Sequence, residues 1–249
     1  MKKTPTIIER KKHIYILGDS LVCYYNGNPT STGSDGYPTP GTAQTGWGQV
    51  FANFIKDDVN VTNLAESGNY AQGLYNSVFK TVIANAYPGD VLLFEVGYND
   101  RNYPAELGSD SARYENMKNY MELAYNEASE KGIEVIFVTP NASAHGTGWK
   151  SGVQGTGHVI EKSDALGAKY INLSGISYAF LEPKGIDWTT NNFNVQGDTL
   201  HSAFFGAMKC AEIVAQELHD IDGYSDWVDT TKSYTLTDNA GESYILQVK

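Results

Sequence analysis

The sequence predicts a three-layer α/β/α domain built on a five-stranded parallel sheet. Short β-rich runs alternate with longer runs whose apolar residues have helical spacing, and this alternation is typical of βαβ units. Residues 91–96 are almost continuously apolar, as expected of a strand that is buried on both faces. The chain has 249 residues, 41% of them hydrophobic, which is enough for one large core.

The elements follow in a regular order. The first expected strand, residues 13–17, ends at Gly18-Asp19-Ser20. A long loop rich in Gly, Pro, Ser and Thr follows over residues 26–45, and a segment with helical spacing over residues 47–56. The later strands are expected at residues 59–64, 91–96, 133–138 and 169–173, and the later helices at 70–86, 111–131, 153–166 and 202–219.

The last stretch departs from this alternation. Tyr234-Thr235-Leu236 and Tyr244-Ile245-Leu246 flank the turn-like Asp238-Asn239-Ala240-Gly241, which predicts a β-hairpin. No linker precedes this hairpin. We therefore expect one domain over residues 13–228, with the hairpin of residues 229–249 appended to it.

Composition limits the partners. Acidic residues exceed basic ones, 29 to 18, and the net charge of −11 would repel nucleic acid. No run approaches the length of a membrane span, so neither nucleic acid nor a membrane is expected as a partner. The composition favours a secreted or extracellular monomer, although residues 1–12 show no secretory signal and a cytoplasmic location is the alternative. Cys23 and Cys210 are expected to be free and buried rather than disulfide-bonded.

Polar residues gather where the expected strands end. The carboxyl ends of parallel strands share one edge of the sheet, and ligands bind there. The residues delivered to this edge are Asp19-Ser20, Ser67-Gly68-Asn69 and Gly97-Tyr98-Asn99-Asp100, with Asp198-Thr199-Leu200-His201 before the last helix.

These residue types can carry out acyl transfer. A serine hydroxyl becomes a nucleophile only when a base takes its proton, and His201 is the candidate base for Ser20. Asp198, three residues before His201, can fix the tautomer of the imidazole. Asp19 and Asp100 are alternative carboxylates, and we expect both to hold turns by accepting backbone hydrogen bonds.

Taken together and in this chain order, the blocks resemble the SGNH (GDSL-type) hydrolases over about residues 13–219. The matching residues are Gly18-Asp19-Ser20, Gly68, Gly97-x-Asn99-Asp100 and Asp198-x-x-His201. The resemblance implies a flavodoxin-like strand order and a serine esterase with Ser20, Asp198 and His201 as catalytic residues. It also implies an oxyanion hole formed by the backbone N–H groups of Ser20 and Gly68 and the side-chain amide of Asn99.

Within the superfamily, this sequence is more similar to one branch than to the others. Gly46-Trp47-Gly48-Gln49, Asn63-Leu64-Ala65-Glu66-Ser67-Gly68 and Gly206-Ala207 after His201 look like the rhamnogalacturonan acetylesterase-like branch. The implied substrate is an O-acetylated plant-wall polysaccharide, either pectin/rhamnogalacturonan or xylan. The sequence departs from that branch at Tyr98, where a histidine is usual, and at Asn69, where an arginine is common. These departures leave open which polysaccharide is the substrate.

Four residues are expected to line the substrate site: Trp47, Asn69, Tyr98 and Trp188. Trp149 and Trp188 could each stack on a sugar or pack locally. The remaining histidines and the two cysteines share no metal-ligand spacing, so neither a metal nor another cofactor is expected.

Two other functions are alternatives to an acetylesterase. A lysophospholipase or acyl-thioesterase of the same superfamily would need an apolar acyl groove, whereas the loop at residues 26–45 is polar. A non-catalytic carbohydrate-binding module would not need the set Ser20, Asn99, Asp198 and His201.

Overall fold

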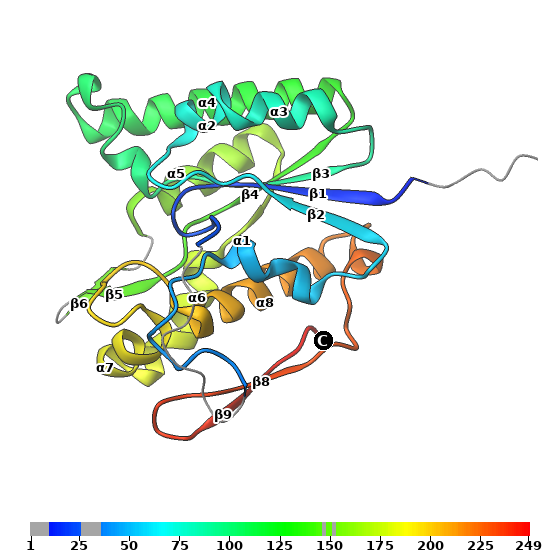
Figure 1. Ribbon diagram of the computed structural model, residues 1–249. Coiled ribbons are helices and arrows are strands. Elements are labelled where there is room, and N and C mark those ends of the chain that lie inside the picture. The colour runs from blue at the N-terminus through cyan, green and yellow to red at the C-terminus, as the bar shows by residue number, and fades with distance from the viewer. Residues whose placement is uncertain (1–9, 26–35, 146–147, 151–152) are drawn as a thin grey trace, which may run out of the picture.

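The computed structural model describes residues 10–25, 36–145, 148–150 and 153–249. The chain forms three layers, with a sheet between two layers of helices (Figure 1). Of the long loop expected at residues 26–45, residues 26–35 lie outside the described part of the chain.

The central sheet has five parallel strands in the order β2-β1-β3-β4-β7. The strands are β1 (Lys12–Leu17), β2 (Val59–Asn63), β3 (Val91–Glu95), β4 (Glu134–Val138) and β7 (Lys169–Ile171). This is the flavodoxin-like order, so the predicted fold class is confirmed. All the carboxyl ends lie at one edge of the sheet because every pair is parallel.

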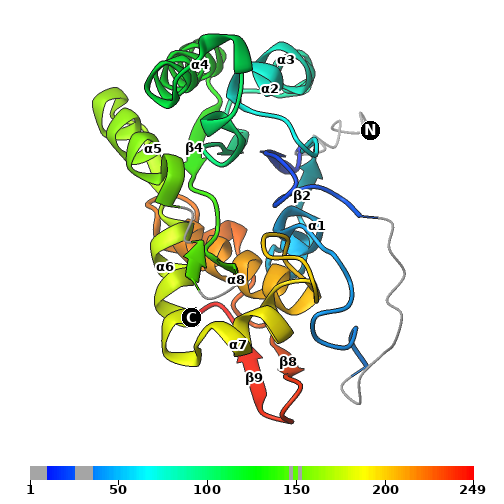
Figure 2. The same cartoon turned by 90° about the vertical axis from the view of Figure 1, so that its left-hand side faces the viewer.

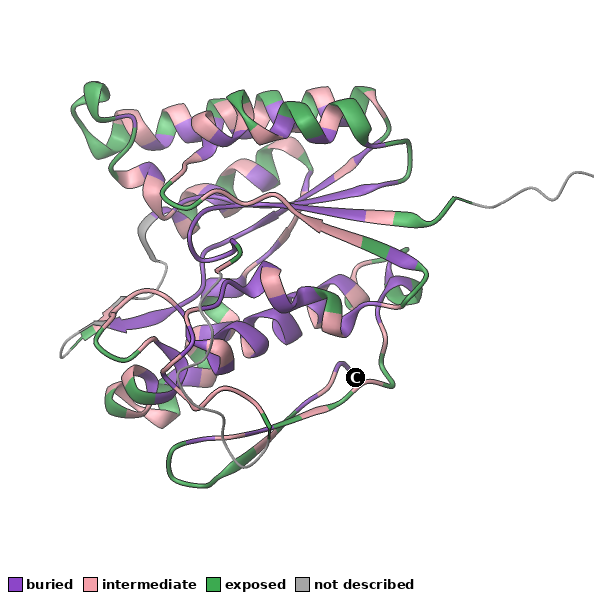
Figure 3. Ribbon diagram, in the orientation of Figure 1, coloured by how far each residue is buried: buried purple, intermediate pink, exposed green. Residues whose placement is uncertain are grey.

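The sheet divides the apolar residues into two cores. Side chains alternate along a strand, so Ile14 and Ile16 of β1 face one core while Tyr15 and Leu17 face the other. The central strands β3 and β4 are buried along almost their whole length, whereas the edge strand β2 and the outer faces of the helices are partly exposed (Figure 3). Burial on both faces explains why residues 91–96 form a continuous apolar run.

Each core is covered by its own helices (Figure 1). One face of the sheet carries α2 (Ala71–Asn76), α3 (Val78–Asn85), α4 (Asp110–Glu130) and α5 (Val153–Leu166). The other face carries α1 (Trp47–Val50), α6 (Leu173–Leu181) and α8 (Phe204–Asp220). A short helix α7 (Ile186–Trp188) and a π turn (Thr189–Phe193) precede the segment that leads to α8.

Three local predictions differ from the structure. The helix expected at residues 70–86 is broken at Ser77, whose hydroxyl donates to the carbonyl of Gly73 at 2.9 Å. The helix expected at 47–56 ends at Val50 and continues as a 3₁₀ turn, Phe51–Phe54. The fifth strand ends before Leu173, which instead begins α6 behind an Asn172 side-chain cap.

A small hairpin was also not predicted. It consists of β5 (Ser143–His145) and β6 (Gly148–Lys150), which pair antiparallel. Three-residue strands give too short a period-two pattern to be recognised in the sequence.

The predicted C-terminal hairpin is present as β8 (Tyr234–Thr237) and β9 (Ser243–Leu246). Leu236 and Leu246 are each 2% exposed and belong to the core that α8 covers. The hairpin therefore packs into the same apolar core as one face of the main sheet.

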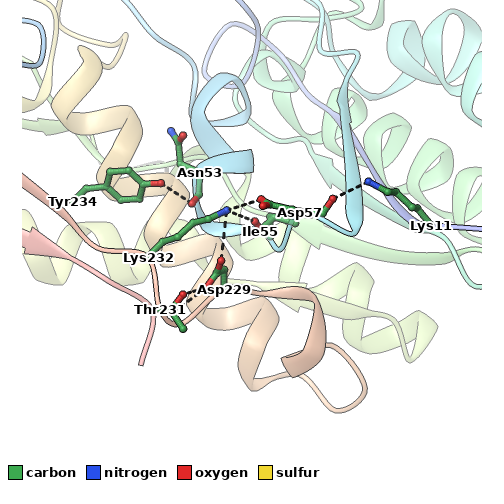
Figure 4. A network of polar contacts seen from close by, with 8 residues as sticks. All are labelled: Lys11, Asn53, Ile55, Asp57, Asp229, Thr231, Lys232 and Tyr234. Carbon is green, nitrogen blue, oxygen red and sulfur yellow. Dashed lines mark hydrogen bonds and ion pairs between the residues drawn. The ribbon is translucent and has the colours of Figure 1, made fainter.

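Polar contacts hold the start of this hairpin against the segment before β2 (Figure 4). Lys232 donates to the carbonyl of Ile55 at 3.0 Å and to the Asp57 carboxylate at 3.1 Å. The Tyr234 hydroxyl donates to the carbonyl of Asn53 at 2.9 Å. These contacts join segments more than 170 residues apart in sequence.

Cys23 and Cys210 are both free and both buried, which confirms the expectation of free thiols. Within the described ranges, no helix combines the length and the apolar character needed to cross a bilayer.

Candidate active site

Ser20 lies in a turn that directly follows β1. The Asp19 carboxylate accepts a hydrogen bond from the Leu21 N–H at 2.9 Å, and the Asp19 carbonyl accepts one from the Val22 N–H at 3.1 Å. A β-carbon at Gly18 would come within 2.5 Å of the Val22 side chain, so the chain needs a glycine there. This turn holds Ser20 at the carboxyl edge, where it is 7% exposed.

His201 and Asp198 form a pair within one turn of chain. The ring nitrogen Nδ1 of His201 lies 2.7 Å from one carboxylate oxygen of Asp198. The other oxygen accepts the N–H groups of Leu200 at 2.7 Å and His201 at 3.0 Å. Burial would raise the pKa of Asp198, but the hydrogen bonds from His201 and Leu200 outweigh it and lower the pKa. The pairing at Nδ1 makes Nε2 the ring nitrogen that can accept a proton from a nucleophile.

The segment before α1 connects the His201 loop to the Ser20 turn. The Thr45 N–H donates to the carbonyl of Ser202 at 2.9 Å, and the Trp47 N–H donates to the carbonyl of Leu21 at 3.0 Å. Three stretches that are distant in sequence are therefore tied together by backbone hydrogen bonds.

Tyr25 provides a second connection, which sequence reasoning missed. Its hydroxyl donates to the carbonyl of Ser20 at 2.7 Å, and its ring lies 6.4 Å from the His201 ring in an edge-on arrangement. Tyr25 therefore contacts both the backbone of Ser20 and the ring of His201. Only the position of Tyr25 five residues after Ser20 could have drawn attention to it.

The three expected oxyanion donors also come together. The Asn99 amide nitrogen donates to the Asp19 carboxylate at 3.0 Å and to the carbonyl of Asn69 at 2.9 Å. Asn99 is therefore bonded to the neighbours of both Ser20 and Gly68. Gly68 has φ +77°, which a glycine adopts without strain. Within the described part of the chain, the N–H groups of Ser20 and Gly68 donate to no other protein atom.

Asp100 and Asp19 hold turns, as predicted. Asp100 accepts the N–H groups of Ala71 at 3.0 Å and Gly97 at 2.8 Å, and so joins α2 to the end of β3. Burial raises the pKa of Asp100 to about 6, although these hydrogen bonds oppose the rise.

Glu95 is a buried acid that the sequence analysis did not single out. It ends β3, is 1% exposed, and accepts a hydrogen bond from the Trp47 indole N–H at 2.7 Å. Burial and the nearby Asp19 raise its pKa well above the usual range. Burial likewise raises the pKa of Asp19 to about 7, against the Leu21 N–H bond. In the sequence, the only sign of this buried acid is that Glu95 interrupts the apolar run of residues 91–96.

Two of the four expected substrate-binding residues are placed elsewhere. Trp47 is 1% exposed and bonded to Glu95, so it has no surface to offer a sugar, and the prediction for Trp47 is wrong. Trp188 donates its indole N–H to Asp238 at 2.7 Å and packs edge-on against Phe205. It anchors the C-terminal hairpin and is not brought together with Ser20, because local packing fixes its ring.

Asn69 and Tyr98 lie beside the candidate site residues. The Asn69 side chain accepts the Tyr70 N–H at 2.9 Å and donates to Glu66 at 2.7 Å, so it stabilises its own turn. Tyr98 is partly buried, and burial raises its pKa; Arg101 opposes this rise, while Asp19 and Asp198 add to it. Tyr98 is therefore within electrostatic reach of both ends of the site.

In the part of the chain that the structure describes, no three His, Cys, Asp or Glu side chains gather in a way that could hold a metal ion. The chemistry that this site can perform on its own is acyl transfer through a hydroxyl, an imidazole and amide donors.

The chain resembles known proteins over most of its length. Residues 14–172 match the model of the family described as GDSL-like Lipase/Acylhydrolase. The uncharacterized esterase YxiM of Bacillus subtilis is 29% identical over 82% of this chain, and the chain spans 51% of the length of YxiM. The probable rhamnogalacturonan acetylesterase YesY of the same organism is 25% identical over 84% of this chain and 93% of its own length.

Solved structures share the fold. The crystal structure of Bacillus subtilis YxiM has a TM-score of 0.69 at 25% identity, covering 86% of this chain and 58% of that one. An acetylxylan esterase from Geobacillus stearothermophilus has a TM-score of 0.56 at 18% identity, covering 83% of this chain and 93% of its own. The second likeness concerns the fold alone.

Proposed function

Because the chain belongs to the GDSL-like lipase/acylhydrolase family of hydrolytic enzymes, we propose that it is a serine esterase that removes O-acetyl groups from plant-wall polysaccharide. The observation that carries the proposal is the Asp198–His201 pair, linked through Tyr25 to Ser20 at the sheet edge. The relative named as a probable rhamnogalacturonan acetylesterase supports an acetyl ester of a sugar as the substrate class.

In the proposed mechanism, His201 accepts the proton of the Ser20 hydroxyl through Nε2 as the oxygen attacks the ester carbonyl. The Asp198 carboxylate at Nδ1 stabilises the imidazolium that forms. As the bond between the carbonyl carbon and the sugar oxygen breaks, His201 gives its proton to that oxygen, which leaves as a hydroxyl, and the acetyl group stays on Ser20. In the second half, His201 activates a water molecule that releases acetate.

The oxyanion of each tetrahedral intermediate is stabilised by the N–H groups of Ser20 and Gly68 and by the Asn99 amide. Asn99 donates to both Asp19 and the Asn69 carbonyl in the resting structure. The neutral Asn69 carbonyl is the weaker of these acceptors, so the oxyanion would take its place while the bond to Asp19 remains.

The substrate class is tested with two substrate series. We expect acetate release from acetylated rhamnogalacturonan, pectin or xylan, and a steep fall in kcat/KM for p-nitrophenyl esters from acetate to butyrate, with negligible rates by octanoate. A polar site does not provide the ~0.8 kcal/mol per methylene of an apolar groove. A kcat/KM that rises up to octanoate would overturn the proposal in favour of a lipase or thioesterase.

The catalytic assignment is tested with Ser20→Ala. We expect kcat to fall by about 10⁴-fold or more while the melting temperature is retained. Ser129→Ala removes an exposed hydroxyl on the last turn of α4 and serves as the matched control, with activity unchanged. Wild-type turnover by Ser20→Ala would remove Ser20 from the mechanism.

A further inference from the structure

A cavity of about 560 Å³ lies at the carboxyl end of β7, away from the residues that gather around Ser20. It is lined by side chains and backbone from β6, α5 and the beginning of α6: Trp149, Thr156, Gly157, Asn172, Gly175 and Tyr178. Seen from the carboxyl edge of the sheet, α5 and α6 lie on one side of the molecule, with β5 beside α6 (Figure 2).

The walls of this cavity are aromatic, amide and hydroxyl groups. The rings of Trp149 and Tyr178 meet edge-on, with centroids 5.4 Å apart and planes at 83°, and both side chains are partly exposed. Asn172 accepts the Gly175 N–H at 3.0 Å, which fixes its amide at the rim. None of the lining residues that the structure describes carries a charge.

Such a lining fits one class of ligand. The apolar C–H face of a sugar ring stacks on an aromatic ring, while its hydroxyls bond to amide and hydroxyl groups. A phosphate or uronate would find no cation among the described residues that line the cavity. An acyl chain would meet polar atoms along the walls. An uncharged sugar unit therefore matches this cavity better than either.

The cavity and the Ser20 turn share one edge of the sheet. Three strand spacings separate β1 from β7, which is about 14 Å across the edge. The backbone of Gly155, at the start of α5, meets that of Gly97, so a β-carbon at Gly155 would lie 2.4 Å from the Gly97 carbonyl. Gly97 is two residues before Asn99. The wall of the cavity thus rests on the loop that carries the Asn99 amide.

We propose that this cavity binds an uncharged sugar unit of the same polysaccharide chain whose acetylated unit lies at Ser20. The inference rests on the proposed function, since only a polymeric carbohydrate could occupy both places. The cavity would hold the polymer a few units from the ester and leave small esters unaffected.

Binding without turnover gives the first test. Calorimetry is done with two unacetylated ligands, xylohexaose and a rhamnogalacturonan hexasaccharide. Trp149→Ala is expected to weaken binding of at least one by about tenfold. Tyr87→Ala, which removes a tyrosine that is 57% exposed just before β3, is the matched control and should bind as the wild type does. If neither ligand binds in a manner that depends on Trp149, the inference is wrong.

A second variant tests the cavity without changing the small β5–β6 hairpin, which Trp149→Ala could unfold. A β-carbon at Gly157 would meet nothing within 4 Å, so Gly157→Leu has room at its first carbon and places the rest of its side chain at the cavity. We expect both Gly157→Leu and Trp149→Ala to raise KM for long acetylated oligosaccharides by about tenfold and to leave kcat/KM for p-nitrophenyl acetate unchanged. An equal loss on both kinds of substrate would overturn the inference.

The two proposals fail in different ways. If the wild type releases no acetate from any acetylated saccharide but binds oligosaccharides through Trp149, the esterase substrate is wrong and the sugar site stands. If acetate is released and the Trp149 and Gly157 variants behave as the wild type with long substrates, the esterase stands and the sugar site is refuted.

Discussion

Asp19 uses its two carboxylate oxygens for different tasks. One accepts the Leu21 N–H and shapes the turn that carries Ser20, and the other accepts the Asn99 amide. The residue before Ser20, the proposed nucleophile, therefore holds a group that is 80 positions away in sequence. In the proposed mechanism this makes Asp19 a positioning residue for the oxyanion hole.

Asp19→Asn tests this role at the residue scale. With its oxygen kept on Leu21, the new amide would point a donor at the donor of Asn99, and the Asn99 side chain would turn away. We expect kcat for p-nitrophenyl acetate to fall by roughly 10²-fold with little change in KM. Glu130→Gln, an acid-to-amide change at an exposed residue at the end of α4, is the control and should keep its kcat. A rise in KM with kcat unchanged would contradict the positioning role.

At the scale of elements, α5 approaches the loop after β3 closely at Gly97, two residues before Asn99. Gly155 has φ +91° and lies against the backbone of Gly97, itself at φ +120°. Two glycines in contact allow the helix and the loop to touch without side chains between them. The helix thereby supports both the Asn99 loop and the wall of the proposed sugar site.

Gly155→Ala is expected to disturb both elements. The new methyl would lie 2.4 Å from the Gly97 carbonyl oxygen and would also occupy a strained backbone conformation. We predict a loss of about 1–3 kcal/mol of unfolding free energy in urea and a lower kcat for p-nitrophenyl acetate. Gly157→Ala, two residues along the same helix in open space, should retain both quantities. A Gly155 variant with wild-type kcat would show that α5 does not position the loop.

At the scale of the whole molecule, buried acids make stability depend on pH. Asp19, Asp100 and Glu95 are each at most 5% exposed around the carboxyl end of β3. Burial raises the pKa of Asp19 from 3.8 to about 7 and that of Asp100 from 3.8 to about 6, and it raises the pKa of Glu95 as well. Between the unfolded and the folded pKa values, the folded protein holds more protons than the unfolded chain. Raising the pH in that window therefore favours unfolding.

We predict that the melting temperature falls by several degrees between pH 4.5 and pH 7.5. Burial lowers the pKa of His13, which acts in the opposite direction, and we expect the three buried acids to outweigh this one group. The opposite shift of Asp198, whose pKa is lowered, gives stability that is lost only below the usual aspartate range and does not oppose this trend. Glu95→Gln should flatten the curve, because it removes one of the acids while keeping an acceptor for Trp47. A melting temperature that is constant or rises over this window would contradict the prediction.

The sequence by itself determined the layers, the parallel sheet and the C-terminal hairpin, because these depend on short-range patterns. The continuous apolar run at residues 91–96 requires burial on both faces, and this is what β3 has. The Asp198–His201 pair is also local, since three residues of separation fit one turn. A serine after the first strand reaches the carboxyl edge in any parallel arrangement of these strands.

The tertiary structure alone decided which polar and aromatic residues face the site. Trp47 looked like a sugar-stacking residue, but its indole bonds to Glu95, 48 positions away, in the core. Trp188 donates to Asp238 beside the C-terminal hairpin, and Trp149 lies partly exposed at a cavity near the end of β7. Whether a ring is covered depends on elements distant in sequence that pack over it, and neither periodicity nor spacing along the chain contains that information.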